Sequence, residues 1–112
     1  MNVLFTPEIQ NYFDELECIL YDKGYYGFEK SAIKYVDDLI YDIKANLPQK
    51  RHRPAPEYYH KYGKDMYCAS FVKNKHTTWY AFFTKYWENG ETIYLVRYIG
   101  NNHTDAHHLY KG

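Results

Sequence analysis

Two stripes of apolar residues at helical spacing run through the first half of the chain, with acidic and polar residues between them. Thr6-Pro7-Glu8 has the composition of a helix start: an N-cap threonine, a proline at the first helical position and an acid in the first turn. We predict one helix from this start to Gly24 and a second that stops before Pro48, joined as a hairpin. The stripes are Ile9, Phe13, Leu16 and Leu20 in the first helix, and Ala32, Val36, Leu39, Ile43 and Leu47 in the second.

Strand patterns flank the helices. Residues 1–5 form a short strand candidate, and aromatic and β-branched residues dominate 66–73, 77–87 and 92–99. Turns at 73–76 and 88–91, the second with the pair Asn89-Gly90, connect these segments as an antiparallel meander. Residues 49–63 form a long basic connection, and the tail 100–112 has no clear periodicity. We therefore predict a single α+β domain over residues 1–112.

The net charge of zero conceals an uneven distribution. Residues 1–47 contain nine acids and four lysines, whereas residues 48–112 contain ten Lys and Arg, five acids and all six histidines. This asymmetry favours a polyanion as the partner of the second half, although a solvated helical surface beside a lysine-bearing sheet has the same composition. The fifteen tyrosines suit stacking on unpaired bases and ordinary strand formation equally well.

The compartment follows from what the sequence lacks. It has no secretory segment and no apolar run near the roughly 20 residues that a membrane span requires. We expect a soluble cytoplasmic protein with no membrane partner, in which Cys18 and Cys68 are free thiols.

The main candidate site is the end of the last predicted strand. The segment from Arg97 to His103 combines a guanidinium, a glycine turn, two amides and an imidazole. If these groups converge, the arginine can stabilise charge on a phosphorane while the histidine moves a proton. Arg97 shares strand parity with the apolar Ile93, Leu95 and Ile99, so parity leaves its exposure undecided. The alternative is an arginine paired with an acid of the helices.

Two further basic groups are candidates for phosphate contact. One is the turn around residues 73–76, which is equally consistent with a hairpin tip that has no function. The other is the proline-flanked connection, which also suits an acidic partner segment. The candidate RNA-binding residues are Lys73, Lys75 and His76 in the turn, and Arg51, Arg53 and Lys64, with Lys61 nearby, in the connection.

Other chemistry is not indicated. Adjacent histidines such as His107 and His108 do not converge readily on one ion, even with His103 nearby, so no metal is expected. No cofactor is expected either, because the chain has no Gly-rich phosphate loop. The motifs of acyl transfer and glycoside hydrolysis are also missing.

The order of elements resembles the RelE/ParE superfamily of bacterial toxins. The resemblance covers nearly the whole chain and is carried by Pro54-Ala55-Pro56, Met66-Tyr67, Thr78-Trp79-Tyr80 and the stretch 94–100. It implies the toxin half of a type II toxin–antitoxin pair, built as a helical hairpin on a twisted antiparallel sheet. RelE-like members cut messenger RNA in the ribosomal A site, and ParE-like members inhibit DNA gyrase. The segment Arg97 to His103 is similar to the strand-end motif of HigB-type toxins.

The chain departs from this pattern at several positions. The strand positions at which RelE-like nucleases carry lysines and an arginine hold Cys68, Ser70 and Thr78 here. A glutamate used as base by YoeB-like members falls near Ala55, two positions before Glu57. The Arg and Tyr of the family's last loop fall near His103 and Tyr110.

The resemblance therefore carries over three catalytic candidates, Arg97, His103 and Tyr110. The favoured hypothesis is a metal-independent, ribosome-dependent mRNA endoribonuclease in which the 2′-OH attacks its own phosphate. Arg97 would stabilise the phosphorane, His103 would act as general acid or base, and Lys73 and Lys75 would hold the backbone. The partners expected are a cognate antitoxin, the ribosome and mRNA. The alternatives are a ParE-like, non-catalytic inhibitor of DNA gyrase, and a catalytically decayed member that only binds a partner.

Overall fold

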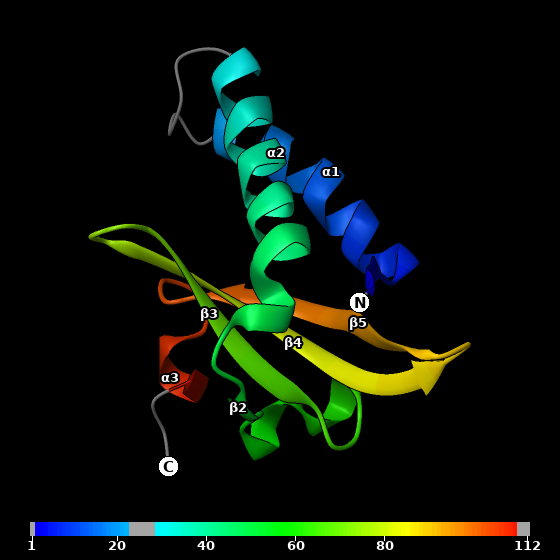
Figure 1. Ribbon diagram of the computed structural model, residues 1–112. Helices are drawn as coiled ribbons and strands as arrows, with labels where there is room; N and C mark the ends of the chain where they lie inside the picture. Colours follow the sequence, from blue (N-terminus) through cyan, green and yellow to red (C-terminus); the bar gives the residue numbers. More distant parts are fainter. Residues whose placement is uncertain (1, 23–28, 110–112) are drawn as a thin grey trace.

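The computed structural model describes residues 2–22 and 29–109, which form an α+β fold around one five-stranded sheet (Figure 1). The strands of the predicted meander and both predicted helices are present, with ends within a few residues of those expected. In chain order the elements are β1 (Asn2–Phe5), α1 (Pro7–Asp22), α2 (Glu29–Asn46), η1 (Leu47–Gln49), β2 (Arg53–Pro54), η2 (Glu57–Tyr62), β3 (Tyr67–Asn74), β4 (Thr77–Glu88), β5 (Glu91–Asn101) and α3 (Ala106–Leu109). The predicted helix end at Gly24 lies outside the described residues.

The sheet is mixed, so the predicted purely antiparallel sheet is wrong in one respect. The strand order is β1-β5-β4-β3-β2, and β1 pairs parallel with β5, with Asn2 opposite Ile93 and Phe5 opposite Val96. The other pairs are antiparallel. Alternating side chains indicate a strand but carry no information on its direction, which is why the sequence did not show the parallel pair.

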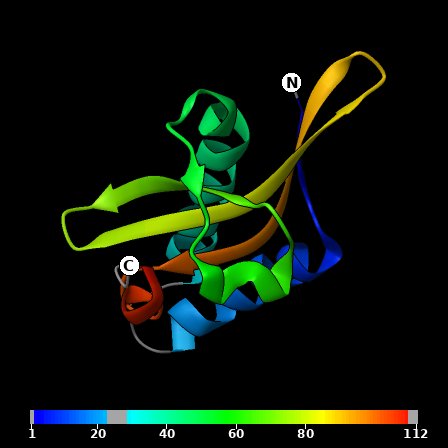
Figure 2. The ribbon, with the colours of Figure 1, turned by 90° about the horizontal axis from the view of Figure 1, so that it is seen from below.

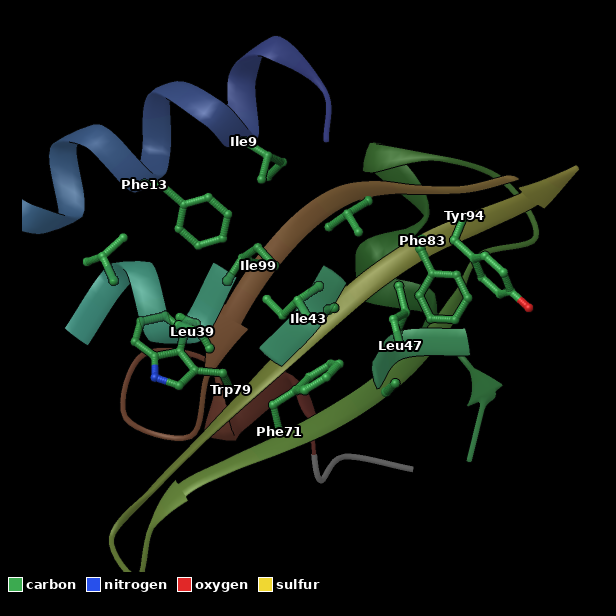
Figure 3. Packing of buried hydrophobic residues seen from close by; sticks show 14 of the residues in the cluster. Ile9, Phe13, Leu39, Ile43, Leu47, Phe71, Trp79, Phe83, Tyr94 and Ile99 are labelled. Atoms are coloured by element: carbon green, nitrogen blue, oxygen red, sulfur yellow. The ribbon is translucent and has the colours of Figure 1, made fainter. Parts of the chain in front are cut away.

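The helical hairpin covers one face of the sheet, and the main core lies between them (Figures 1 and 3). Thr6 caps α1, since its hydroxyl accepts a hydrogen bond of 3.3 Å from the backbone N–H of Ile9. Both predicted stripes point into this layer, although Leu20 is only half-buried. The sheet contributes Ala69, Phe71, Trp79, Ala81, Phe83, Tyr94, Val96 and Ile99.

The opposite face of the sheet has its own smaller core. The segment that contains η2 crosses beneath the strands and α3 lies beside it, as Figure 2 shows from below. Tyr59, 0 % exposed, is at the centre of this layer and stacks on Phe82 with ring centroids 4.0 Å apart. The predicted loop 49–63 and part of the tail are therefore ordered covers of the sheet. Both are short 3-10 or α-helical turns, which have too few residues to show a period.

Both cysteines are free, as predicted, with Cys18 exposed and Cys68 buried. Within residues 2–22 and 29–109, no helix combines the length and the apolar character that crossing a membrane requires.

Candidate nucleic-acid interface

Arg97 occupies a β-bulge. Tyr98 pairs with Phe82 and Val96 pairs with Phe83, so Arg97 is an extra residue of β5 that has no opposite residue on β4. Such a bulge shifts the alternation of side chains by one position. Tyr94 and Val96 before it, and Ile99 after it, all face the helical layer. Arg97 and Tyr98 both turn to the other face, which settles the parity that the sequence left open.

The bulge lies directly after the last residue of β5 that pairs with β1, which is Val96. The backbone N–H of Thr6 donates to the carbonyl of Val96 at 3.3 Å, after which the chain turns into α1. Among the described strands, none pairs on this side with the part of β5 from Arg97 onward. A cleft of about 640 Å³ opens there. Its walls come from three places in the sequence: Glu8 and Tyr12 of α1, Lys61 and Tyr62 of η2, and Arg97 and Tyr98 of β5.

The Arg97 side chain reaches the cleft across a glycine. Its Nε donates to the hydroxyl of Thr84 at 3.3 Å. A Cβ built on Gly63 would lie 2.8 Å from the Cδ of Arg97, so the approach needs a residue without a side chain at position 63. The one ion pair in the described part of the chain joins Lys34 and Asp38. The alternative of an Arg97 paired with a helical acid is therefore wrong for these residues.

Lys61 supplies the second cation of the cleft. Its Nζ lies 3.9 Å from the ring centroid of Tyr58 and 5.5 Å from that of Tyr62. A hydrogen bond with the Tyr58 side chain raises the pKa of Lys61. Lys61 therefore stays positively charged at neutral pH, and no carboxylate among the described residues pairs with it. Two unpaired cations in one cleft are suited to an anionic ligand.

The tyrosines of the cleft are hydrogen-bond donors. Burial, with a further contribution from Asp105, raises the pKa of Tyr12 to about 12. The pKa of Tyr98 is also raised, first by burial and then by the charge of Asp105. Both phenols keep their protons at neutral pH, so neither can act as a general base. Tyr12 can donate to a phosphate oxygen, whereas Tyr98 donates its single proton to Asp105.

A buried carboxylate stands behind this wall of the cleft. Asp105 is 4 % exposed and accepts hydrogen bonds from the hydroxyls of Tyr59 at 2.9 Å, Tyr98 at 3.2 Å and Thr104 at 2.6 Å. A Cβ built on Gly100 would lie 2.7 Å from its carboxyl group. Glycine at this position therefore allows Asp105 to approach the end of β5.

His103 lies at a different end of the sheet from Arg97. Its Nε2 is 3.1 Å from the hydroxyl of Thr77, at the tip of the β3–β4 hairpin. About five residues of β4 separate Thr77 from the bulge, or roughly 17 Å at 3.3 Å per residue. The expectation that Arg97 and His103 converge on one phosphate is therefore wrong. After the bulge β5 continues as a strand to Asn101, which carries His103 away from Arg97 along the strand direction.

The hairpin tip and His103 form a separate basic area. Asn102 donates to the backbone carbonyl of His76 at 3.0 Å, which fixes the turn 101–104 against the tip. Lys75 and His76 are exposed there. Lys73 turns toward α2, where its Nζ lies 4.7 Å from the ring centroid of Tyr35. None of the three lines the cleft.

The remaining predicted residues are scattered. Arg51 and Arg53 are exposed, and Arg53 belongs to β2 at the edge of the sheet farthest from β1. Lys64 is exposed directly after Gly63, beside the cleft. Tyr110 lies outside the described residues.

Sequence reasoning missed Glu8, Tyr12, Tyr62 and Tyr98 as members of one site. They are far apart in the chain and share no spacing motif. A cation followed by tyrosine occurs in the cleft as Lys61-Tyr62 and Arg97-Tyr98, but the same pair occurs outside it as Lys34-Tyr35 and Lys85-Tyr86, so this pattern did not single out the site.

The described residues include no group of three or more His, Cys, Asp or Glu side chains placed to hold a metal ion. In comparisons with known proteins, no protein-family model, no curated protein and no solved structure matches this chain.

Proposed function

We propose that this chain is the toxin of a type II toxin–antitoxin pair and cuts messenger RNA on the ribosome, with the Arg97 cleft as its active site. The observation that carries the proposal is the pair of unpaired cations, Arg97 and Lys61, set among tyrosine hydroxyls in a cleft beside the open edge of β5. The RelE/ParE resemblance of the sequence supports the same class. The proposal moves the reaction from the Arg97–His103 segment to this cleft.

Four residues of the cleft have roles in an attack of the 2′-OH on the adjacent phosphorus. Arg97 and Lys61 hold the phosphate and stabilise the charge of the phosphorane. Glu8, the one carboxylate among the described residues of the cleft, takes the proton of the 2′-OH. Tyr12 gives its proton to the leaving 5′ oxygen. The products are a 2′,3′-cyclic phosphate and a free 5′-OH, so the protons balance without a metal.

Primer-extension mapping of mRNA in cells expressing each variant tests the proposal. Arg97→Gln keeps a polar side chain but removes the charge, and we expect cleavage to slow by about 10²-fold or more. His103→Ala and the matched cation control Lys75→Gln should cut like the wild type, because both lie outside the cleft. A wild type that cuts no mRNA overturns the nuclease. Normal cutting by Arg97→Gln removes the cleft from the mechanism.

A second candidate is a ParE-like inhibitor of DNA gyrase that has no catalytic site. The observation that favours it is that the strand positions at which RelE-like nucleases carry cations hold Ser70, Thr78 and the buried Cys68 here. A supercoiling assay with purified gyrase separates the two classes, since the nuclease leaves that reaction unchanged. A chain inactive in both assays that still binds its antitoxin would be the decayed member.

The antitoxin partner is part of the proposal. An acidic or amphipathic segment of a small protein would complement the cations around the cleft. A short reading frame beside this gene, whose product binds the chain and blocks its toxicity, is the expected finding.

A further inference from the structure

Two tyrosines form a parallel stack in the wall of the cleft. The rings of Tyr62 and Tyr98 have centroids 4.3 Å apart and an angle of 14° between their planes. They come from η2 and β5, and both line the cleft with Arg97 and Lys61. We infer that this stack is the wall on which one unpaired RNA base lies, beside the phosphate held by the two cations. The inference rests on the proposed RNA substrate and adds which residues bind the base.

The order of residues along the chain supports this assignment. In a regular strand, Arg97 and Tyr98 would point to opposite faces. The bulge at Arg97 turns both toward the same face. Lys61 and Tyr62 form a second pair of a cation and a ring on η2. The cleft thus places two charges next to two stacked rings, and a nucleotide likewise has its phosphate next to a planar base.

Buried residues on the other side of Tyr98 hold its ring in place. The Tyr98 hydroxyl donates to Asp105 at 3.2 Å, and the same carboxyl oxygen accepts a hydrogen bond of 2.9 Å from Tyr59. The Tyr98 ring also lies 5.5 Å from Tyr59 and 5.7 Å from Phe82, centroid to centroid. Tyr98 is thereby fixed before any ligand arrives, and it supports Tyr62. A ring ordered in advance loses little entropy when a base stacks on it.

A protein segment is the other ligand that an aromatic wall beside cations would suit. It would contact the tyrosines without needing a base. The inference is therefore tested with a pair of RNA probes that differ only in one base.

The experiment measures the binding of purified full-length chain to a short single-stranded RNA by fluorescence polarisation. Every ribose carries a 2′-O-methyl group, so the probe lacks the nucleophile and cannot be cut. A second probe series replaces one base at a time by an abasic site. For the wild type we expect at least one abasic probe to bind about 5- to 150-fold more weakly than the complete probe, the effect of losing one base–aromatic stack.

The variants then assign that loss to the stack. Tyr62→Leu keeps the bulk but removes the ring, so it should bind the complete probe as weakly as the wild type binds the abasic one. Tyr62→Phe keeps the ring and should bind like the wild type. Tyr41→Leu, at a tyrosine 65 % exposed on α2 and away from the cleft, is the matched control. Circular dichroism of each variant checks that the fold is intact.

Two results would overturn the inference: a Tyr62→Leu variant that discriminates the probes as well as the wild type, or a wild type that binds none of the probes. The nuclease proposal fails separately. Ring-dependent binding without mRNA cleavage in cells keeps the subsite and removes the nuclease. Normal cleavage with ring-independent binding keeps the nuclease and removes the subsite.

Discussion

At the scale of single residues, Asp105 is the most consequential side chain outside the cleft itself. Burying a carboxylate is costly unless its oxygens accept hydrogen bonds. Three hydroxyls and the backbone N–H of Asn101 donate to it, and every buried side-chain N or O in the described residues has a partner. One acid thereby joins the turn after β5 to η2 and to the last strand.

We expect Asp105→Asn to lower the free energy of unfolding by about 2 kcal/mol. The amide keeps the shape but loses the charge, and its NH₂ group faces hydroxyls that are already donors. Urea unfolding followed by circular dichroism measures the change. Asp37→Asn, at an exposed position of α2, should stay within about 0.5 kcal/mol of the wild type. Equal stability of the two variants would contradict a structural role for the buried network.

At the scale of elements, β5 changes from an inner strand to an edge strand at its bulge. The first part is an inner strand between β1 and β4, and the second is an edge strand that faces the cleft. Gly100, one residue before the end of β5, lies directly beside Asp105. Gly90 is the contrasting glycine: it has φ of 81° in the β4–β5 turn, and a Cβ there would meet nothing within 4 Å.

These two glycines make a matched pair of predictions. Gly90→Ala should cost about 1 kcal/mol, because the only penalty is the left-handed backbone. Gly100→Ala should cost more, about 2 to 3 kcal/mol, because the new methyl displaces the Asp105 carboxyl and disturbs its hydrogen bonds. Urea denaturation of both variants gives the ranking. The reverse order would show that Asp105 moves away at little cost.

At the scale of the whole molecule, the cations of the second half divide into separate areas. The Arg97 cleft lies at the β1 side of the sheet, and His103 with Lys75 and His76 lies at the tip of the β3–β4 hairpin. The tips of the β3–β4 and β4–β5 hairpins lie at opposite ends of the sheet (Figure 2). The acidic first half provides the helical layer on the other face, although Lys50 and Lys73 of the second half also lie on that side, against Phe71 and Tyr35.

The salt dependence of RNA binding should report which area is used. If Arg97 and Lys61 contact phosphates, the logarithm of the association constant should fall against the logarithm of the salt concentration with a slope of about −1.4. Arg97→Gln and Lys61→Gln should each reduce this slope by about 0.7, whereas Lys75→Gln should leave it unchanged. Titrations of the uncleavable probe at several salt concentrations measure it. A slope that responds to Lys75 alone would move the interface to the hairpin tip.

Much of the architecture was predictable from local patterns. The stripes from Ile9 to Leu20 and from Ala32 to Leu47 predicted both helices, and the runs around Phe71, Phe82 and Val96 predicted the long strands. These predictions succeeded because periodicity records which side of each element is buried. Arg97 was the main site candidate from the sequence, and in the described structure no helical acid pairs with it. Its assigned partner His103 was wrong, because nearness in sequence did not become nearness in space.

By itself, the sequence determined the order and type of the main elements, the two free thiols and the division of charge, since each depends on residue type and local spacing. Only the tertiary structure decided the parallel pairing of β1, the bulge at Arg97 and the cleft. Register and strand direction arise from contacts between distant segments, and these leave no period in the chain. The same contacts bring Tyr12, Tyr62 and Tyr98 from α1, η2 and β5 to one site.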